Sequence, residues 1–406
     1  MDPFLQAAIE EAKKGRAAGG IPIGSVLVCD GKIIGRGWHR RAGLPHAEIE
    51  AIDDAQKRGH NPRGATLYVT LEPCSTHGRT PPCTDAIIAA GIKRVVIGAV
   101  DPNPKHAGRA FKLLRRAGIE AESFGVPRLR GKDNVSRSDR LKAELQTLSA
   151  GCQQLNEAFN HWIVHGTPLV TVKAAMTLDG KIATADRESK WITGEKARAY
   201  AMQLRQGTDA VLVGINTILA DDPSLTARKK MADGRWKTVK PIRRIVLDSK
   251  ARTPLKAKVV TDKFAPLTTI VVGTGAPRHR VTALAKRVKV ITAPTTTVGR
   301  AYSRAGSSKA WPRAQTDLAW LLKKLGSENV TSLLVEGGGE VNASFLLGGF
   351  AGRVAFFYAP KILGGRDSLK AVAGQGARSL AQAVQLRDVE WKRLGRDLLL
   401  TAQVAP

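Results

Sequence analysis

The chain has 406 residues, of which 43% are hydrophobic and 24% charged, and this excludes a protein that is disordered throughout. No apolar run approaches the roughly 18 residues that a membrane-spanning helix needs. The start, MDPFLQAAIEEAKKG, carries acids and lacks the apolar core of a signal peptide. We therefore expect two or three folded domains in the cytoplasm, with no membrane contact.

The net charge of +29 is unusual, because 64 Lys and Arg face only 35 Asp and Glu. Two stretches, 228–244 and 278–313, are rich in Lys and Arg and almost free of acids. They lack a clear periodicity, and we interpret them as loops or solvated edges. Such a surface attracts phosphorylated substrates or polyanions. Few aromatic side chains are present there to stack on bases, so nucleic-acid binding is the less favoured interpretation.

Helical and strand patterns alternate in the first part of the chain. Helices are expected at 4–17, 46–56, 82–90 and 107–117, the last two ending at glycines. Strands are expected at 23–29, 32–37, 66–70 and 94–99, the first two joined by an Asp-Gly turn. This alternation predicts a layered α/β domain that ends near residue 125.

A second alternation begins at Pro168, after a polar, basic stretch at 126–150 that is typical of a linker and whose second half could extend into a helix. Its clearest strands are expected at 169–174, 210–214, 244–248, 269–273, 289–292 and 332–336. We therefore expect an α/β domain at 1–125, a basic linker with a connecting helix at 126–167, and a second α/β domain at 168–406.

A candidate metal centre lies in the first domain. His46 and Glu48 form an H-x-E at the start of a predicted helix, and Cys74 and Cys83 follow. One imidazole and two thiolates are typical zinc ligands that leave a fourth position for water. Zinc lowers the pKa of that water and creates hydroxide near neutral pH. In zinc deaminases with an H-x-E the Glu moves protons and does not bind metal, and we assign Glu48 that catalytic role.

The remaining cysteines, Cys29 and Cys152, are isolated from this pattern, and four cysteines are too few for a disulfide scaffold. An H-x-E alone is common, and the thiols of Cys74 and Cys83 could simply be buried. The order of H-A-E, TLEPC and a PPC that opens a helix favours the metal interpretation over that alternative.

The spacing between Cys74 and Cys83 is longer than P-C-x-x-C. The segment TLEPCSTHGRTPPC, with GWHRRAG before PHAE and with DPNP after the following strand, resembles the deaminase half of the bifunctional riboflavin-biosynthesis deaminase/reductases. The resemblance implies a three-layer cytidine-deaminase-like zinc domain. It also points to substrate contacts at His39, Arg79, Asp101 and Asn103.

Residues 19–24 depart from that family, which usually carries Pro-Asn-Pro-x-Val-Gly with a substrate-contacting Asn. This chain has Gly-Gly-Ile-Pro-Ile-Gly, which is more similar to cytosine and tRNA-adenosine deaminases. A backbone group, His39 or Asn103 could replace the missing contact. The alternative is a pocket that accepts a simpler base such as cytosine, and we favour the first interpretation.

The second half resembles the reductase half of the same family. The matching segments are VTVKAAMTLDGKIA, SKWITG, GINTILADDPSLTAR, IVLDS, LLVEGGGEVNASF and YAPKILGG, in family order. The resemblance implies a dihydrofolate-reductase-like α/β fold and NADPH as cofactor. The strand at 333–335 leads through EGGG into a helical pattern, an arrangement that lets backbone N–H groups approach a phosphate. Gly273-Thr274-Gly275 lacks the third glycine of a dinucleotide fingerprint, so we treat it as unrelated to cofactor binding.

The resemblance also assigns individual residues in this half. The expected NADPH contacts are Ala175, Trp191, Thr217, Asp221, Ser249, Gly338, Gly339, Glu340, Val341, Asn342, Ala343 and Ser344. The expected substrate contacts are Ser189, Arg205, Leu225, Arg228 and Glu336. Guanidinium groups bind phosphate in a bidentate manner, which suits Arg205 and Arg228 to a phosphorylated substrate.

We therefore expect a bifunctional enzyme, homo-oligomeric and acting on a phosphorylated pyrimidine. It would deaminate 2,5-diamino-6-(5-phosphoribosylamino)pyrimidin-4-one with zinc and then reduce the ribosyl chain to ribityl with NADPH. The rival hypothesis is a cytosine or nucleic-acid-base deaminase fused to a degenerate reductase. A third, a nucleic-acid-binding protein that uses its basic loops, leaves the metal pattern unexplained.

Overall fold

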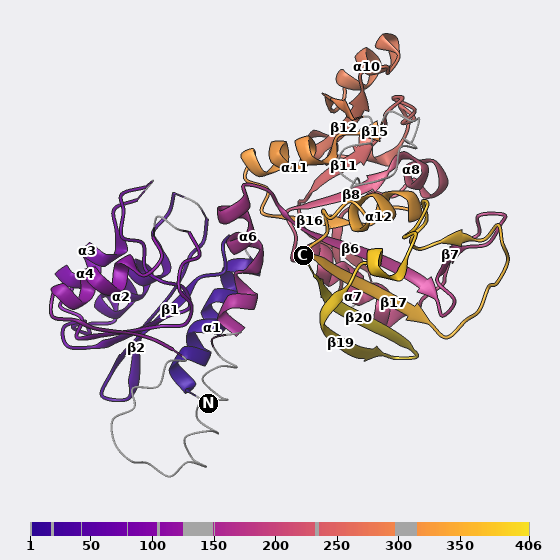
Figure 1. Cartoon of the computed structure of the whole chain (residues 1–406). Helices are drawn as coiled ribbons and strands as arrows, with labels where there is room; N and C mark the ends of the chain where they lie inside the picture. Colours follow the sequence, from indigo (N-terminus) through magenta and orange to yellow (C-terminus); the bar gives the residue numbers. More distant parts are fainter. Residues whose placement is uncertain are drawn as a thin grey trace. The chain divides into compact units, whose positions relative to one another are not determined.

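The computed structural model describes residues 2–405 except 18–19, 42, 79, 104–105, 125–148, 150, 232–234 and 297–314. The chain divides into two compact units, Met1–His165 and Gly166–Pro406, whose elements can be followed in Figure 1. Within the described residues, no helix is long and apolar enough to cross a membrane. The helix expected in the second half of 126–150 lies almost wholly outside the described residues.

A five-stranded sheet forms the centre of the first unit, with the order β2-β1-β3-β4-β5. Its strands are β1 (Gly24–Cys29), β2 (Lys32–Trp38), β3 (Thr66–Val69), β4 (Arg94–Ile97) and β5 (Glu120–Ser123). The turn between β1 and β2 has positive φ angles at Asp30 (48°) and Gly31 (72°), which suits the twist of a tight hairpin. Strands β3, β4 and β5 are parallel, and β1 is antiparallel to both of its neighbours. The sequence patterns predicted four of these strands and missed the short β5.

Helices cover both faces of this sheet. They are α1 (Pro3–Ala17), α2 (Ala47–Lys57), α3 (Cys83–Ala89), α4 (Arg109–Arg116) and α6 (Glu157–His165). Buried residues of α2, α3 and α4 pack on one face, and those of α1 pack on the other, where Phe159 of α6 joins them. The predicted three-layer α/β architecture is confirmed.

Close packing between α2 and β2 fixes the position of the first turn of α2, next to the candidate metal site. A Cβ atom at Gly35 or Gly37 of β2 would overlap with the backbone carbonyl of Ala51 or Ala47, respectively. Glycine on the strand and alanine on the helix therefore bring the two backbones together. The first turn of α2, which follows His46 and carries Glu48, is held firmly against the sheet.

The second unit contains a nine-stranded sheet with the order β13-β12-β11-β8-β16-β6-β17-β20-β19. Its strands are β6 (Leu169–Thr177), β8 (Ala210–Gly214), β11 (Arg243–Leu247), β12 (Thr268–Gly273), β13 (Lys289–Ala293), β16 (Ser332–Val335), β17 (Arg353–Ala359), β19 (Leu386–Leu394) and β20 (Asp397–Val404). Every neighbouring pair from β13 to β17 is parallel, whereas β20 is antiparallel to β17 and β19. All six expected strands are present, and β17, β19 and β20 were not expected.

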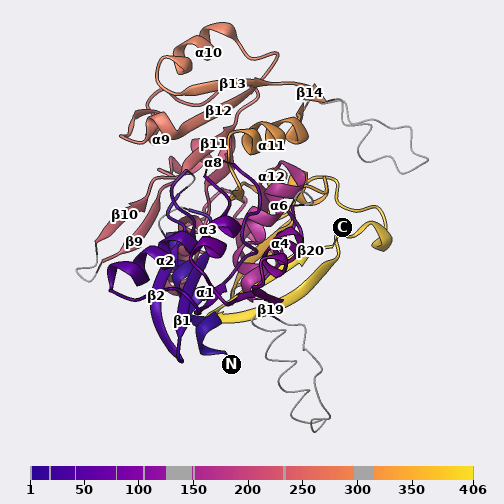
Figure 2. The same ribbon diagram turned by 90° about the vertical axis from the view of Figure 1, so that its left-hand side faces the viewer.

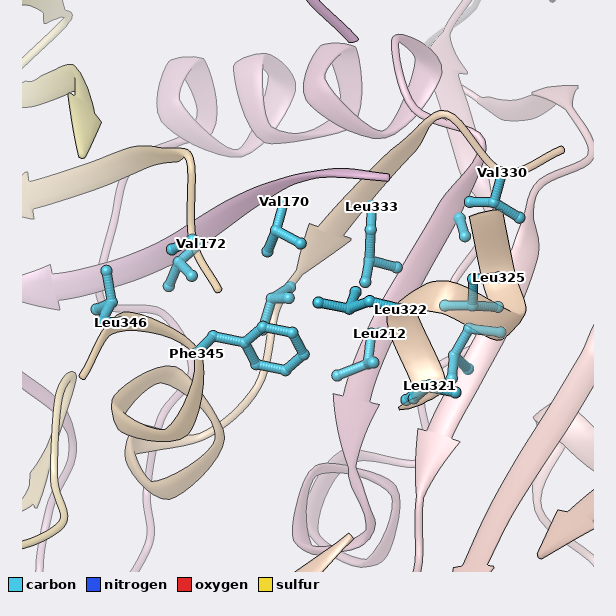
Figure 3. Packing of buried hydrophobic residues seen from close by; sticks show 14 of the residues in the cluster. Val170, Val172, Leu212, Leu321, Leu322, Leu325, Val330, Leu333, Phe345 and Leu346 are labelled. Carbon is cyan, nitrogen blue, oxygen red and sulfur yellow. The ribbon is translucent and has the colours of Figure 1, made fainter. Parts of the chain in front are cut away.

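Both faces of this sheet are buried, as alternate residues of β8 illustrate. Leu212 belongs to a core with α11 (Leu318–Ser327) and α12 (Gly339–Leu346), shown in Figure 3. Val211 and Val213 belong to a second core on the opposite face, which contains α8 (Ile215–Asp221), α9 (Lys258–Thr261) and α10 (Arg278–Ala285). Helix α7 (Glu195–Gln206) packs on β17 and β20. Burial on both faces explains the nearly continuous apolar character of the central strands.

The two basic stretches, expected to be loops or solvated edges, contain regular elements that loops would lack, and one of these, β13, is an edge strand of the main sheet. Strands β9 (Ala227–Lys230) and β10 (Trp236–Lys240) form a separate antiparallel hairpin, which Figure 2 shows beside the main sheet. Part of the other stretch forms α10 and β13, and its residues 297–313 lie outside the described residues. A hairpin with exposed charged side chains has no apolar alternation, and this explains why periodicity missed it.

Candidate active sites of the two units

Three potential metal ligands from separate elements converge in the first unit. His46 precedes α2, Cys74 follows β3, and Cys83 opens α3. The Nδ1 atom of His46 lies 3.2 Å from Sγ of Cys83 and 3.5 Å from Sγ of Cys74. The three ligand atoms all lie within 4.8 Å of one another. This donor set fits zinc with an open fourth position.

The two thiols ionise very differently because they share a hydrogen bond. The thiol of Cys83 donates toward Cys74, and this contact, reinforced by His46, lowers the pKa of Cys74. The same contact raises the pKa of Cys83. The backbone N–H of Cys83 also donates to Sγ of Cys74 at 3.3 Å. Metal ligation requires the thiolate form, so zinc binding at these cysteines releases protons.

Glu48 is the second residue of α2 and is only 3% exposed. Its Oε2 atom is buried and has no hydrogen-bond partner among the described residues. Burial raises the pKa of Glu48 to about 7, although His46 opposes the rise. A carboxyl group with a free oxygen and a pKa near neutrality is suited to accept a proton and return it.

Thr80 is a functional candidate that the sequence motifs did not single out. Its Oγ1 lies 3.4 Å from Nε2 of His46, while Nδ1 of the same ring faces the two sulfurs. With Nδ1 as the ligand atom, Nε2 carries the hydrogen and donates to Thr80. Such a partner fixes the tautomer and the orientation of a metal-binding imidazole. Thr80 lies in the long segment between the cysteines, so the extra length of that segment supplies the contact.

Glu72 organises the loop that carries two of the predicted substrate contacts. Its buried carboxylate accepts backbone N–H groups from Asp101 (3.1 Å), Gly108 (3.0 Å) and Ala110 (3.0 Å). Asp101 in turn accepts the N–H of Asn103 at 2.8 Å, and burial raises the pKa of Asp101. Glu72 therefore holds the loop after β4 in its conformation. The local sequence around Glu72 does not predict this role.

His39 lies directly beside the metal ligands. Its ring meets that of His46 edge-on, with centroids 5.1 Å apart, and it is 3% exposed. A Cβ atom at Gly20 would lie 2.9 Å from the carbonyl oxygen of His39, so the segment that departs from the family pattern borders this histidine. Arg79, the remaining predicted contact in this unit, lies outside the described residues.

A cavity of about 680 Å³ marks the candidate site of the second unit, at the carboxyl ends of central strands. Nine residues predicted to contact cofactor or substrate line it together: Ala175, Ser189, Trp191, Arg205, Thr217, Asp221, Leu225, Arg228 and Glu336. The residues come from β6, α7, α8, β9 and the loops that follow the strands. Lys173, which was not singled out in the sequence, also lines it.

Glu336 is the electrostatic centre of this cavity. Arg205 binds its carboxylate through two nitrogens, at 2.6 and 3.0 Å, and Nζ of Lys173 lies 3.4 Å away. Burial opposes the ionisation of Glu336, but the two cations outweigh it and hold its pKa at about 2. Arg205 also donates to the carbonyl of Thr226, so its guanidinium group forms hydrogen bonds with two other residues of the protein.

The predicted cofactor segment at 338–344 forms the start of α12. A Cβ atom at Gly338, the N-cap residue, would enter open space, as expected of a position that leaves room for a ligand. Further along the helix, Asn342 is fully buried and donates to the carbonyl of Ala371 at 2.8 Å. Neither this segment nor Ser249, which follows β11, lines the cavity itself.

Trp191 is the most conspicuous apolar group at the cavity. It is 64% exposed, and the guanidinium of Arg198 lies 4.6 Å from its ring centroid. An exposed aromatic ring at a cavity offers a surface that a planar ligand covers.

Two family profiles match this chain. The profile described as the RibD C-terminal domain matches residues 168–400, more than half of the chain. The profile described as the zinc-binding region of cytidine and deoxycytidylate deaminases matches residues 2–99. The second match covers the three candidate zinc ligands, and the first covers the cavity.

Similar proteins match over nearly the whole length. The riboflavin biosynthesis protein RibD of Aquifex aeolicus is 38% identical over 396 residues, which cover 98% of this chain and 96% of the relative. RibD of Escherichia coli is 34% identical, with 98% and 97% covered. The crystal structure of a diaminohydroxyphosphoribosylaminopyrimidine deaminase/5-amino-6-(5-phosphoribosylamino)uracil reductase from Thermotoga maritima is 33% identical, with a TM-score of 0.72 and 99% and 98% coverage. RibD of Acinetobacter baumannii has a TM-score of 0.76 at 28% identity, with 100% and 98% coverage.

Proposed function

Because the chain belongs to the RibD family of bifunctional deaminase/reductases of riboflavin biosynthesis, we propose that its two units act in sequence on one phosphorylated pyrimidine. The first unit deaminates 2,5-diamino-6-(5-phosphoribosylamino)pyrimidin-4-one. The second reduces the ribosyl chain of the deaminated product to ribityl. The observation that carries the proposal is the convergence of His46, Cys74 and Cys83 beside Glu48, whose buried Oε2 atom has no hydrogen-bond partner among the described residues.

In the first unit, His46, Cys74 and Cys83 would hold zinc, which when bound activates water as a nucleophile. Glu48 would move the two protons of the attacking water in turn, one to the ring nitrogen and one to the amino group, so that ammonia leaves and a carbonyl forms. Burial favours the protonated form of Glu48, and the charge of a metal ion opposes this, so the group stays able to exchange its proton. Thr80 keeps the His46 ring in one tautomer, and Glu72 holds Asp101 and Asn103 toward the substrate.

In the second unit, NADPH would supply the hydride. The cofactor contacts are those predicted for Ala175, Trp191, Thr217 and Asp221, with a phosphate near the N-terminus of α12 at Gly338. The reduction adds hydride to the sugar carbon attached to nitrogen and a proton to the oxygen released when the ring opens. Lys173, a partly buried amine at the cavity wall, is placed to give that proton, and its contact with Glu336 orients it.

A cavity of about 680 Å³ lies within the volume range of small-molecule and cofactor sites. Arg228, from β9 at the cavity wall, is the proposed partner of the substrate phosphate. Burial and the neighbouring Arg205 lower the pKa of Arg228, so an anion beside it relieves an existing repulsion. Self-association and a cytoplasmic location remain predictions from the sequence.

Mass spectrometry of the products, with and without NADPH, tests the proposal on the purified chain. We expect ammonia and the deaminated phosphoribosylaminouracil without NADPH, and the ribityl product only when NADPH is present. Free cytosine in a parallel reaction addresses the unusual residues 20–23. Deamination of cytosine but not of the phosphoribosylated substrate would contradict the proposal and support the rival base deaminase.

A further inference from the structure

Arg244 of β11 is a fully buried arginine that does not line the reductase cavity. Its five N–H donors are matched by five hydrogen bonds. Two go to Asp262, at 2.7 and 2.9 Å, and one goes to Oγ1 of Thr268 at 2.9 Å. The other two reach backbone carbonyls, those of Val259 at 3.1 Å and Ser224 at 2.9 Å. The last of these contacts connects Arg244 to the cavity wall, because Ser224 is a lining residue.

The segment around Ser224 has a strained backbone. Asp222 has a φ of 40° and Leu225 a φ of 51°, and both line the cavity. Asp222 is the C-cap of α8, where aspartate tolerates a left-handed backbone, but the same conformation is a genuine outlier for a bulky residue such as Leu225. Such a conformation persists only when its surroundings hold it, and these positions are common at ligand sites.

Contacts at alternate residues hold this segment. The backbone N–H of Lys258, at the start of α9, donates to the carboxylate of Asp222 at 2.8 Å. Arg244 holds the carbonyl of Ser224, and Arg205 holds that of Thr226 at 3.2 Å. Through Val259 and the adjacent ion pair, Arg244 also secures α9, which provides the first of these contacts. Two of the three anchors therefore depend on one buried guanidinium.

We propose that Arg244 is a positioning residue of the reductase: it holds the segment 222–226, with its left-handed residues Asp222 and Leu225, in place. It thereby sets the position of the cavity wall that Leu225 and Arg228 present to the substrate. This inference rests on the proposed reductase function. Lysine cannot replace it fully, because an ammonium group has three donors and no planar fork to bind Asp262 and two separate carbonyls together. Without Arg244 the segment 222–226 loses its fixed conformation, and a substrate that contacts Leu225 and Arg228 binds more weakly. Lys173 of β6 and Glu336, which follows β16, stay in place.

Arg243 provides a matched control. It is the preceding residue of the same strand and is also an arginine in an ion pair, but its partner is Glu328 and its side chain is 31% exposed. The experiment compares Arg244→Lys with Arg243→Lys in the full chain. It measures reduction of the deaminated phosphoribosyl substrate by NADPH, deamination by the first unit, and thermal unfolding.

We expect Arg244→Lys to raise KM for the pyrimidine roughly tenfold, because the loss of a charged hydrogen bond corresponds to at least that factor. Its kcat should stay within about twofold of wild type, while Arg243→Lys and all deamination rates are unchanged. A role in folding alone would lower kcat in proportion to the unfolded fraction and leave KM unchanged, and that result would overturn the proposal. An unchanged KM in a folded Arg244→Lys variant would do the same.

Asp262→Asn provides the test if Arg244→Lys does not fold, since it weakens the guanidinium's anchor without removing its donors. A KM increase smaller than tenfold supports the proposal, and a KM equal to that of wild type overturns it. If the wild-type protein does not reduce the substrate, the proposed function is wrong. Amide hydrogen exchange then tests separately whether Arg244 holds the segment 222–226. Faster exchange of the 224–226 amides in Arg244→Lys than in Arg243→Lys supports it, and equal exchange refutes it.

Discussion

Each unit buries a glutamate at its candidate site, and the two carboxyl groups are in opposite states. Burial raises the pKa of Glu48 to about 7, and one oxygen of that group lacks a partner. Burial also penalises the charge of Glu336, but Arg205 and Lys173 outweigh the penalty and hold its pKa at about 2. The difference lies in the cations that surround each group and not in the depth of burial. One carboxyl group is arranged to exchange a proton and the other to hold a fixed negative charge.

The two sites also differ in how they are assembled along the chain. All the metal ligands lie between His46 and Cys83, whereas the reductase cavity draws on residues from Lys173 to Phe357. A metal ion requires a few ligands at fixed distances, and short-range motifs can supply them. A cavity for two large ligands needs the ends of several strands. The following substitutions are designed to affect one site and leave the other as an internal control.

The largest expected effect is that of Cys83→Ala on the first site. We expect one zinc ion per wild-type chain and none in the variant, since only His46 and Cys74 remain to hold it. Deamination should be abolished, and reduction of the already deaminated substrate should be unchanged. Metal analysis and ammonia release measure this, with Cys29→Ala as the control because Cys29 lies outside the ligand cluster. Full zinc content in the Cys83→Ala protein would refute the ligand assignment.

Glu48→Gln comes next, because it keeps the size of the side chain and removes its titrating proton. We expect deamination to fall roughly 10²–10⁴-fold, the usual contribution of general acid–base catalysis. Zinc content and reduction should be retained. Glu50→Gln is the matched control, since Glu50 lies on the same helix but forms a partly exposed ion pair with Arg40. Deamination near the wild-type rate in Glu48→Gln would mean that another group moves the proton.

Glu336→Gln tests whether the carboxyl group of Glu336 is held ionised in the folded protein. The measurement is the pH dependence of the unfolding free energy. The pKa of Glu336 is lower in the folded protein than in the unfolded chain, so its stabilisation is complete above pH about 4.5 and is lost as pH falls toward about 2. We expect the variant to lose roughly 3 kcal/mol of unfolding free energy at pH 7. Urea unfolding from pH 7 to pH 3 should show this difference shrinking below pH about 4.5. A difference that does not change with pH would show that Glu336 is not held ionised by its neighbours.

The sequence predicted the first site better than the second for a physical reason. His46, Glu48 and the two cysteines carry chemistry in their residue types and spacing, and the structure brings them together as expected. Thr80 and Glu72 were missed because their contacts, to His46 and to backbone around Asp101, depend on how loops fold. No feature of the sequence distinguishes such residues from ordinary loop positions.

The second unit shows the same limit more strongly. Its six parallel strands from β13 to β6 were predictable from apolar runs, but the hairpin of β9 and β10 was not, because charged side chains hide strand periodicity. Arg243 and Arg244 look alike in a basic stretch. Strand alternation turns one toward Glu328 near the surface and the other into the core beside Asp262. Which of two neighbouring arginines becomes buried is decided by tertiary packing, which local patterns do not encode.

The smallest expected effect distinguishes a phosphate cradle from a plain turn at the start of α12. Gly338 is the N-cap of this helix, its φ is −70°, and a Cβ atom there would enter open space. Gly338→Val should therefore fold normally and interfere only with a ligand. We expect the Kd for NADPH to rise roughly tenfold or more, since charged hydrogen bonds from backbone N–H groups to a phosphate would be lost. The deaminase should be unaffected.

Gly275→Val is the control that makes this test specific. Gly275 also has open space at its Cβ position and belongs to the Gly-Thr-Gly that follows β12, which superficially resembles a dinucleotide-binding turn. Its substitution should leave NADPH affinity unchanged, because the fingerprint lacks its third glycine. Fluorescence titration with NADPH measures both variants. Equal affinities for Gly338→Val and wild type would show that the glycines of EGGG serve the turn alone. Weaker binding in Gly275→Val would mean that the cofactor binds between β12 and α10 and not at the start of α12.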